Sequence, residues 1–195
     1  MIAYVFWHRH AEQADSAGYE DALLAFHRSL NRSRPVGMCG SATFRVPSAP
    51  WLDGSGYEDW YLVEDFTALG VLNEAAVGRG HRTPHDRAAR GIAEGTAGLY
   101  SLVEGERSLP DGVPGAAVPA TWVARTPGSA ERRLGDLLGD GMDPARASLW
   151  RRLLVLGPAP EYCLIAQEAS AGVASTRLPE GWSARTVERE LLYRP

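Results

Sequence analysis

The 195-residue chain contains no lysine, so all 20 of its basic Lys/Arg positions are arginines. This absence excludes a Schiff-base lysine, a lysine general base and the lysine of a phosphate-binding loop. The chain also has only three isoleucines but many alanines, glycines and prolines. Such a bias is typical of coding in a GC-rich bacterial genome.

Cysteine is scarce as well. Cys39 and Cys163 are the only two, too few for a disulfide framework or a thiolate zinc site. Both lie in apolar stretches, which favours buried free thiols over reactive ones. No apolar run approaches 18 residues, and the chain starts on a strand pattern without a basic leader. We therefore expect no membrane span and a reduced, cytoplasmic protein.

Strong net charge and the standard catalytic motifs are also missing. The net charge is −4 with no basic stripe, which argues against nucleic acid as a partner. There is no Gly-x-Gly-x-x-Gly after a strand, no phosphate loop, no Gly-x-Ser-x-Gly elbow and no Cys-x-x-Cys. With 45% hydrophobic residues, the chain can still bury a sizeable core, as one domain or two small ones.

Hydrophobic periodicity over residues 2–104 predicts the order strand, helix, strand, strand, helix, strand. The strands are rich in β-branched and aromatic residues, and the helices carry apolar residues three and four positions apart. The predicted bounds are 2–8, 41–46, 58–63 and 99–104 for the strands and 19–30 and 66–77 for the helices.

The second predicted helix has a cap and a continuation. Asp65 is its expected N-cap, and a further helix would start at Thr83-Pro84, with Thr83 as cap, and end at Gly95. The expected inner face of the 66–77 helix consists of Phe66, Leu69, Leu72 and Ala76.

The pattern restarts after residues 105–118, a Gly/Pro-rich linker without periodicity. The second copy is degraded, because Gly172, Pro179 and Gly181 predict a loop at 169–181, where its second helix belongs. Its other predicted elements are strands over 120–125, 150–156, 162–167 and 186–193 and a helix over 130–138 capped by Ser129. We predict an α+β fold with tandem repeats at 1–104 and 119–195, joined by the 105–118 linker.

This doubled element order resembles a fused form of the dimeric α/β-barrel superfamily, whose unit is the ferredoxin-like βαββαβ fold. The resemblance implies a pseudo-dimeric α/β barrel, with two sheets face to face and helices outside. It also allows a homodimer through exposed sheet edges. The superfamily includes cofactor-independent monooxygenases, muconolactone isomerases, EthD-like proteins, haem-degrading enzymes and chlorite-dismutase-like haem proteins. The last group holds haem through a histidine of its second repeat, whereas all five histidines here precede residue 105.

Two histidines of the first repeat are candidates for a cavity. His8 and His10 project to the same face of a strand, but two ligands are too few for a metal, so no metal is predicted. His8 could be a hydrogen-bonding group in a cavity. His27 lies at the edge of the apolar helix stripe, either as a structural side chain or as a cavity acid or base. His81 and His85 are interpreted as capping and surface polar residues.

Trp51 and residues 57–61 form the densest aromatic and acidic cluster. Strand alternation places Asp59 and Tyr61 on one face and Trp60 on the other. A buried aspartate needs a partner, and Arg45 on the neighbouring strand is the candidate, in a structural ion pair or in a ligand-orienting one. In Trp150-Arg151-Arg152 one arginine points inward, to bind a ligand or to pair with an acid such as Glu161 or Glu188.

The first hypothesis is a small-molecule enzyme that needs no metal or organic cofactor. His8 would transfer protons, and Arg45 with Asp59 would stabilise a developing anion beside Tyr61. The expected ligand-binding residues are Trp7, His27, Trp60 and Arg151. The alternatives are a non-catalytic binding or stress-associated protein that uses the same cavity, and a structural protein whose polar groups only satisfy one another.

Overall fold

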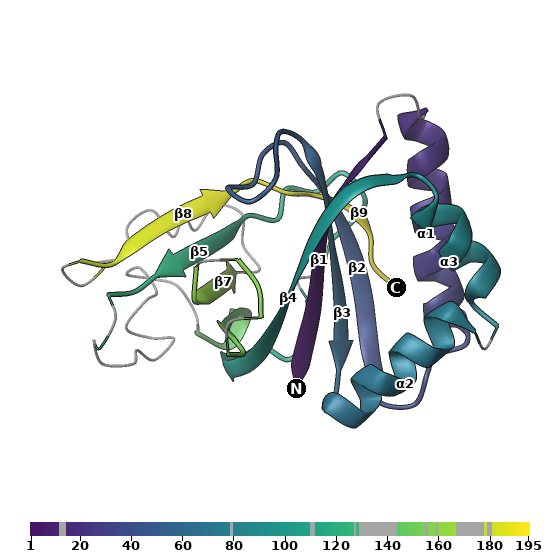
Figure 1. The fold of residues 1–195 in the computed structure, drawn as a ribbon. Helices are drawn as coiled ribbons and strands as arrows, with labels where there is room; N and C mark the ends of the chain where they lie inside the picture. The colour runs from purple at the N-terminus through teal and green to yellow at the C-terminus, as the bar shows by residue number, and fades with distance from the viewer. Residues whose placement is uncertain are drawn as a thin grey trace.

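The computed structural model of the protein describes residues 1–11, 15–78, 80–109, 112–126, 128, 144–154, 156–158, 160–166, 178 and 181–195. In these residues the chain forms three α-helices, one short 3-10 helix and nine strands (Figure 1). In chain order they are β1 (Ile2–His10), α1 (Ser16–Arg32), β2 (Met38–Val46), β3 (Gly56–Val63), α2 (Phe66–Val77), α3 (Arg82–Ala89), β4 (Ile92–Gly105), β5 (Ala120–Ala124), η1 (Pro144–Arg146), β6 (Ala147–Arg152), β7 (Tyr162–Ala166), β8 (Ser183–Val187) and β9 (Glu190–Tyr193).

All nine strands belong to one antiparallel sheet in the order β8-β5-β7-β6-β4-β1-β3-β2-β9. Its two halves, β4-β1-β3-β2 and β8-β5-β7-β6, repeat the same order of first, second, third and fourth strand. The expected two sheets are thus joined into one. The 14-residue strand β4 makes the junction, because it pairs with β1 along most of its length and with β6 at its end.

The sheet curls back on itself, because its two edge strands are neighbours in the chain. Strands β8 and β9 are separated only by Glu188 and Arg189, yet they lie at opposite ends of the strand order. The inner face of the curl carries one buried hydrophobic cluster with side chains from all nine strands. On β1, for example, Ala3, Val5 and Trp7 enter this cluster.

Helices α1, α2 and α3 cover the outer face of strands β1–β4 (Figure 1). The α1 helix begins earlier than predicted, because Asp15 accepts hydrogen bonds from the backbone N–H groups of residues 17 and 18. Its predicted apolar stripe is confirmed: Tyr19, Leu23, Phe26 and Leu30 are all buried. In the described part of the chain, no helix is both long and apolar enough to span a membrane.

The α2 helix keeps its predicted bounds, and Asp65 caps it through a 2.9 Å bond from Ala68 N–H. Its predicted inner face is wrong in part, however. Phe66 is 60% exposed, while Ala68, Leu72 and Ala75 are buried. A helix that is apolar on most of its surface gives no clear stripe, so periodicity misplaced its buried face by part of a turn.

The predicted bounds of the third helix and of the fourth strand are wrong. Helix α3 begins at Arg82, so Thr83 is not its cap, and it ends at Ala89 instead of Gly95. Gly95 instead lies within β4, at a position where strand β1 leaves no room for a side chain. A Cβ at this position would come within 2.6 Å of the Phe6 ring. Glycine therefore marks a close approach between neighbouring strands and does not end a helix.

Replacing Gly95 by alanine should lower the free energy of unfolding by about 1–3 kcal/mol, because the new methyl group must displace the Phe6 ring. Urea denaturation followed by fluorescence would measure the change. Gly40→Ala is the matched control, since a Cβ at Gly40 of β2 meets nothing within 4 Å. Its effect should stay within about 0.5 kcal/mol. Equal stabilities for the two variants would contradict this explanation of Gly95.

The C-terminal segment differs from the prediction in two respects. The strand expected over 150–156 is β6, at Ala147–Arg152. The expected strand over 186–193 is split into β8 and β9, because the chain passes from one edge of the sheet to the other at Arg189. The predicted helix over 130–138 lies outside the described residues, and so does most of the predicted loop over 169–181. Within the predicted linker, Leu109 and Val118 are buried in the inner cluster.

Candidate active site

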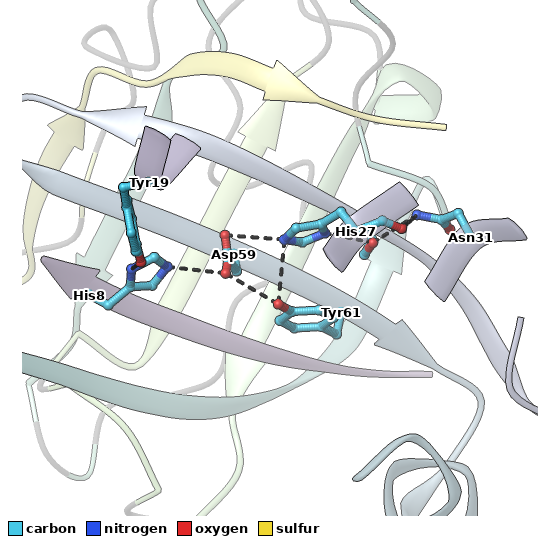
Figure 2. Close-up of polar contacts among 7 residues, drawn as sticks. His8, Tyr19, His27, Asn31, Asp59 and Tyr61 are labelled. Carbon is cyan, nitrogen blue, oxygen red and sulfur yellow. Dashed lines mark hydrogen bonds and ion pairs between the residues drawn. The ribbon is translucent and has the colours of Figure 1, made fainter. Parts of the chain in front are cut away.

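A buried polar network lies on the outer face of the sheet, between strands β1–β3 and helix α1. Asp59 is at its centre, on β3, and Figure 2 shows one histidine on each side of its carboxylate. His8 comes from β1 and His27 from α1. All three side chains are at most 2% exposed. The strand alternation predicted from the sequence therefore places Asp59 and Tyr61 on the same face as His8.

Each oxygen of the Asp59 carboxylate has a histidine partner. His8 Nε2 is 3.1 Å from Oδ2, and His27 Nε2 is 3.4 Å from Oδ1. The Tyr61 hydroxyl donates to Oδ2 at 3.2 Å, and it lies 3.4 Å from His27 Nε2. A buried carboxylate is thus compensated by donors on both sides, as the desolvation of a charge requires.

A hydroxyl group holds the far nitrogen of each histidine. Tyr19 OH lies 2.6 Å from His8 Nδ1, and Ser41 Oγ lies 2.8 Å from His27 Nδ1. Asn31 Nδ2 donates to Ser41 Oγ and thereby fixes the position of the serine hydroxyl beside His27. With Nδ1 held on the far side, Nε2 of each histidine is directed at Asp59.

Burial and charge set the protonation states of the network. Burial alone raises the pKa of Asp59, but the charges and hydrogen bonds of His8 and His27 outweigh it and hold this pKa well below its usual range. Burial, and then the Asp59 charge, raise the pKa of Tyr61 well above its usual value. Asp59 is therefore an anion and Tyr61 a neutral hydrogen-bond donor at neutral pH.

A cavity of about 800 Å³ opens between this network and the three helices. His8, Asp59 and Tyr61 line it from the sheet, and we call them the floor. Most of the other lining residues are apolar, among them Phe6, Leu23, Phe26, Leu30, Leu69, Leu72, Ala76, Val77, Ala88, Ile92 and Leu99. A large apolar pocket with a few convergent polar groups is the usual form of a small-molecule site.

His27 belongs to the network, but it is not among the residues that line the cavity. It lies behind Tyr61, on which its ring stacks at 5.1 Å. The sequence pattern places His27 correctly on the sheet-facing side of its helix. It does not predict the residues that orient the two histidines, which are Tyr19, Ser41 and Asn31. For Tyr19 the only signal is its place in the apolar helix stripe.

The predicted Arg45–Asp59 pair is wrong. Arg45 lies on the expected face, but its guanidinium bonds to Glu20 of α1 at 2.8 Å and to Glu190 of β9 at 2.6 Å. It is 42% exposed, near the sheet edge. A hydrated guanidinium that can reach two carboxylates near water has little to gain from the buried position beside Asp59, where histidines supply the donors.

Trp7 and Trp60, predicted as ligand-binding residues, lie on the inner face, opposite the cavity. Their indole N–H groups donate to the Glu58 carboxylate at 2.7 and 2.6 Å. Arg189 Nη1 also donates to Glu58, and both charged side chains are fully or almost fully buried. Sequence reasoning missed this inner ion pair.

Arg151 lies on β6, outside the group of residues that line the cavity, and donates to Glu161 at 3.0 Å. The alternative prediction of a pair with an internal acid is thus the one observed. The interpretation of His81 as a surface residue is wrong. His81 is 4% exposed and contacts Ser29 Oγ at 2.8 Å and the Ser33 carbonyl at 3.1 Å. It joins the start of α3 to the end of α1.

In the described residues, no three His, Cys, Asp or Glu side chains converge to hold a metal ion. His8 and His27 flank the Asp59 carboxylate on opposite sides (Figure 2). A metal would need the three ligands to converge on one point.

The sequence matches no protein-family model and no curated protein. Three of the solved structures that share the fold illustrate the likeness. A candidate monooxygenase from Fusobacterium nucleatum subsp. nucleatum has TM-score 0.63 and 9% identity, over 99% of this chain and 93% of that one. An anthrone oxidase-like protein has TM-score 0.55 and 10% identity, over 100% and 92%. A candidate monooxygenase from Lactobacillus acidophilus NCFM has TM-score 0.53 and 9% identity, over 98% and 95%. At these identities the likeness concerns the fold alone, and it extends over nearly the whole of each chain, as the resemblance predicted from the element order requires.

Proposed function

We propose that the protein is a small-molecule enzyme that oxygenates or isomerises an apolar, planar ligand without an organic cofactor or a metal. The observation that carries the proposal is the floor formed by His8, Asp59 and Tyr61 beneath an otherwise largely apolar cavity of about 800 Å³. Such a cavity can desolvate an aromatic ring system and leave one polar group of the ligand in contact with the floor.

The His8–Asp59 pair is the proposed proton acceptor, with the carboxylate facing the ligand. Because its pKa is held low, the Asp59 carboxylate is a weak base, so the ligand must bring an activated proton, such as that of an enol, a phenol, or a CH₂ activated by a carbonyl and aryl rings. Tyr61, kept neutral by its raised pKa, can donate to the oxyanion that forms. The resulting carbanion can be reprotonated elsewhere, which is isomerisation.

Oxygenation needs O₂ as the co-reactant. The ligand carbanion would supply electrons to O₂, form a C–O bond and yield a peroxide. Loss of water then converts the original CH₂ to C=O, so one oxygen atom enters the product and the other leaves as water. The ligand itself provides both electron pairs. Two of the structural neighbours are named as candidate monooxygenases, which agrees with this class.

One observation favours a second candidate, a non-catalytic binding protein. Both ring nitrogens of His8 and both of His27 already have partners within the network. A network that satisfies itself can also stabilise an empty pocket and bind a ligand without transferring its proton.

Anthrone, a three-ring ligand with an activated CH₂, tests the proposal. An oxygen electrode should record O₂ consumption with the wild type, and Tyr61→Phe should lower the rate about 10²–10³-fold through loss of the oxyanion donor. His8→Gln should lower it about as strongly. His10→Gln is the matched control, since His10 bonds to the Ala11 carbonyl outside the network and meets the network only through a ring contact with Tyr19 at 5.7 Å. Anthrone that binds without O₂ uptake or isomerisation would support the binding protein, and anthrone that does not bind would contradict the ligand class.

We also propose that residues 119–195 are a degraded second repeat of residues 1–104, connected by 105–118. The repeated strand order in the two halves of the sheet supports this. The described helices α1–α3 all precede residue 90, and the cavity lies beneath them. The chemistry would then belong to the first repeat, and the second would complete the curled sheet.

A further inference from the structure

The helix wall of the cavity also carries polar side chains, Asn73 of α2 and His85 of α3. His85 of α3 lines the cavity, and its side chain is 31% exposed. Its ring meets the Phe26 ring edge-on at 5.4 Å, and the Phe26 ring also lies 6.3 Å from the Tyr61 ring of the floor. His85 is thus separated from the floor by the width of one aromatic ring. A ligand that covers Phe26 can reach Tyr61 at one end and His85 at the other.

The neighbours of His85 fix which of its nitrogens is available. Nδ1 lies 3.1 Å from Asp86 Oδ1, and Arg82 lies 3.5 Å from the other oxygen of that carboxylate. The hydrogen bond from His85, followed by Arg82, lowers the pKa of Asp86. An ionised Asp86 accepts the Nδ1 proton, so neutral His85 presents the Nε2 lone pair as an acceptor. In the described part of the chain, no group donates to Nε2.

We infer that His85 determines specificity for two-ended ligands. These are elongated, planar molecules with a hydroxyl at each end. The first hydroxyl contacts the floor, and the second donates to His85 Nε2. Asp86 is a positioning residue that orients the ring. The inference rests on the proposed function, because it uses the same cavity and the same floor. It adds the requirement for a hydrogen-bond donor at the far end.

Isothermal titration with 2-naphthol and 2,6-dihydroxynaphthalene tests the inference, because the two probes differ only in the far hydroxyl. The symmetric diol gains a factor of two, since either end can meet the floor. A net hydrogen bond of about 0.5–1.5 kcal/mol raises the expected affinity ratio to about five- to twenty-five-fold in the wild type. In His85→Leu the ratio should fall to about two, with 2-naphthol affinity nearly unchanged.

Two further variants separate this role from a structural one. His85→Gln keeps an acceptor and suits a helix, so it should restore part of the ratio. Tyr61→Phe should weaken both probes alike and leave the ratio intact, because it alters the floor and not the far end. Equal ratios in the wild type and His85→Leu, with both probes weakened by Tyr61→Phe, would overturn the inference and leave the proposed function standing. If neither probe binds the wild type, both fail together.

Discussion

Replacing Arg189 by methionine should lower the free energy of unfolding by about 3–5 kcal/mol, because it leaves the Glu58 carboxylate buried without its cationic partner. Glu58 and Arg189 are 0% and 2% exposed, and they lie among the aromatic side chains of the inner face. Trp7 and Trp60 donate to the same carboxylate, but neutral donors cannot replace a charge. Arg189 also donates to the Val118 carbonyl.

Urea denaturation followed by tryptophan fluorescence would measure this loss. Arg45→Met is the matched control, because its ion pairs with Glu20 and Glu190 are partly exposed and should contribute about 1 kcal/mol or less. The double variant Glu58→Gln/Arg189→Met removes both charges and should be more stable than Arg189→Met alone. If the double variant is the less stable of the two, an uncompensated Glu58 charge is not the cause.

The Arg189 side chain also has a topological role. Arg189 lies between β8 and β9, where the chain crosses from one edge of the sheet to the other. Its side chain bonds to Glu58 of β3. Strand β3 thus serves two purposes. Its inner face carries Glu58, whose bond to Arg189 holds the curled sheet together, and its outer face presents Asp59 to the cavity. Because the two residues are adjacent, they lie on opposite faces by strand alternation.

Local patterns predict much of this arrangement. Alternation on a strand needs no knowledge of the rest of the fold, so the sequence alone places Asp59 and Tyr61 on one face and Trp60 on the other. The apolar stripe of α1 is equally local, and so is the cap at Asp65. The predicted element order over residues 2–104 is correct, whereas the bounds of α3 and β4 are wrong, and α1 and β2 begin three residues earlier than predicted.

Pairings between distant segments cannot be predicted in this way. Neighbouring strands suggest that Arg45 pairs with Asp59, but the partners of Arg45 come from α1 and β9. The position of β9 beside β2 depends on how the whole sheet curls. Arg189 escapes prediction for the same reason, because a continuous strand over 186–193 hides the break that turns this residue inward. Hydrophobic patterns predict which residues are buried, whereas the partner of a polar side chain depends on the tertiary fold.

Replacing Asp59 by asparagine tests the site through two quantities, the stability of the protein and the rate of turnover. Asparagine has nearly the same shape, but its amide oxygen can accept from only one of His8 and His27, and its NH₂ group faces the other donor. The variant should lose about 1–3 kcal/mol of stability at pH 7. If anthrone is converted, its turnover should fall about 10²–10⁴-fold, because the proton acceptor is lost.

The pH dependence of this loss identifies its cause. A carboxyl whose pKa is lowered by folding contributes stability above its unfolded pKa, near 3.9, and loses it as the pH falls toward the folded value. The stability difference between wild type and Asp59→Asn should therefore shrink by about 1 kcal/mol between pH 5 and pH 3. Asp53→Asn, at a fully exposed side chain, is the control and should show no such change. A difference that stays constant down to pH 3 would mean that Asp59 is not held as an anion by its two histidines, and the proposed proton acceptor would fail with it.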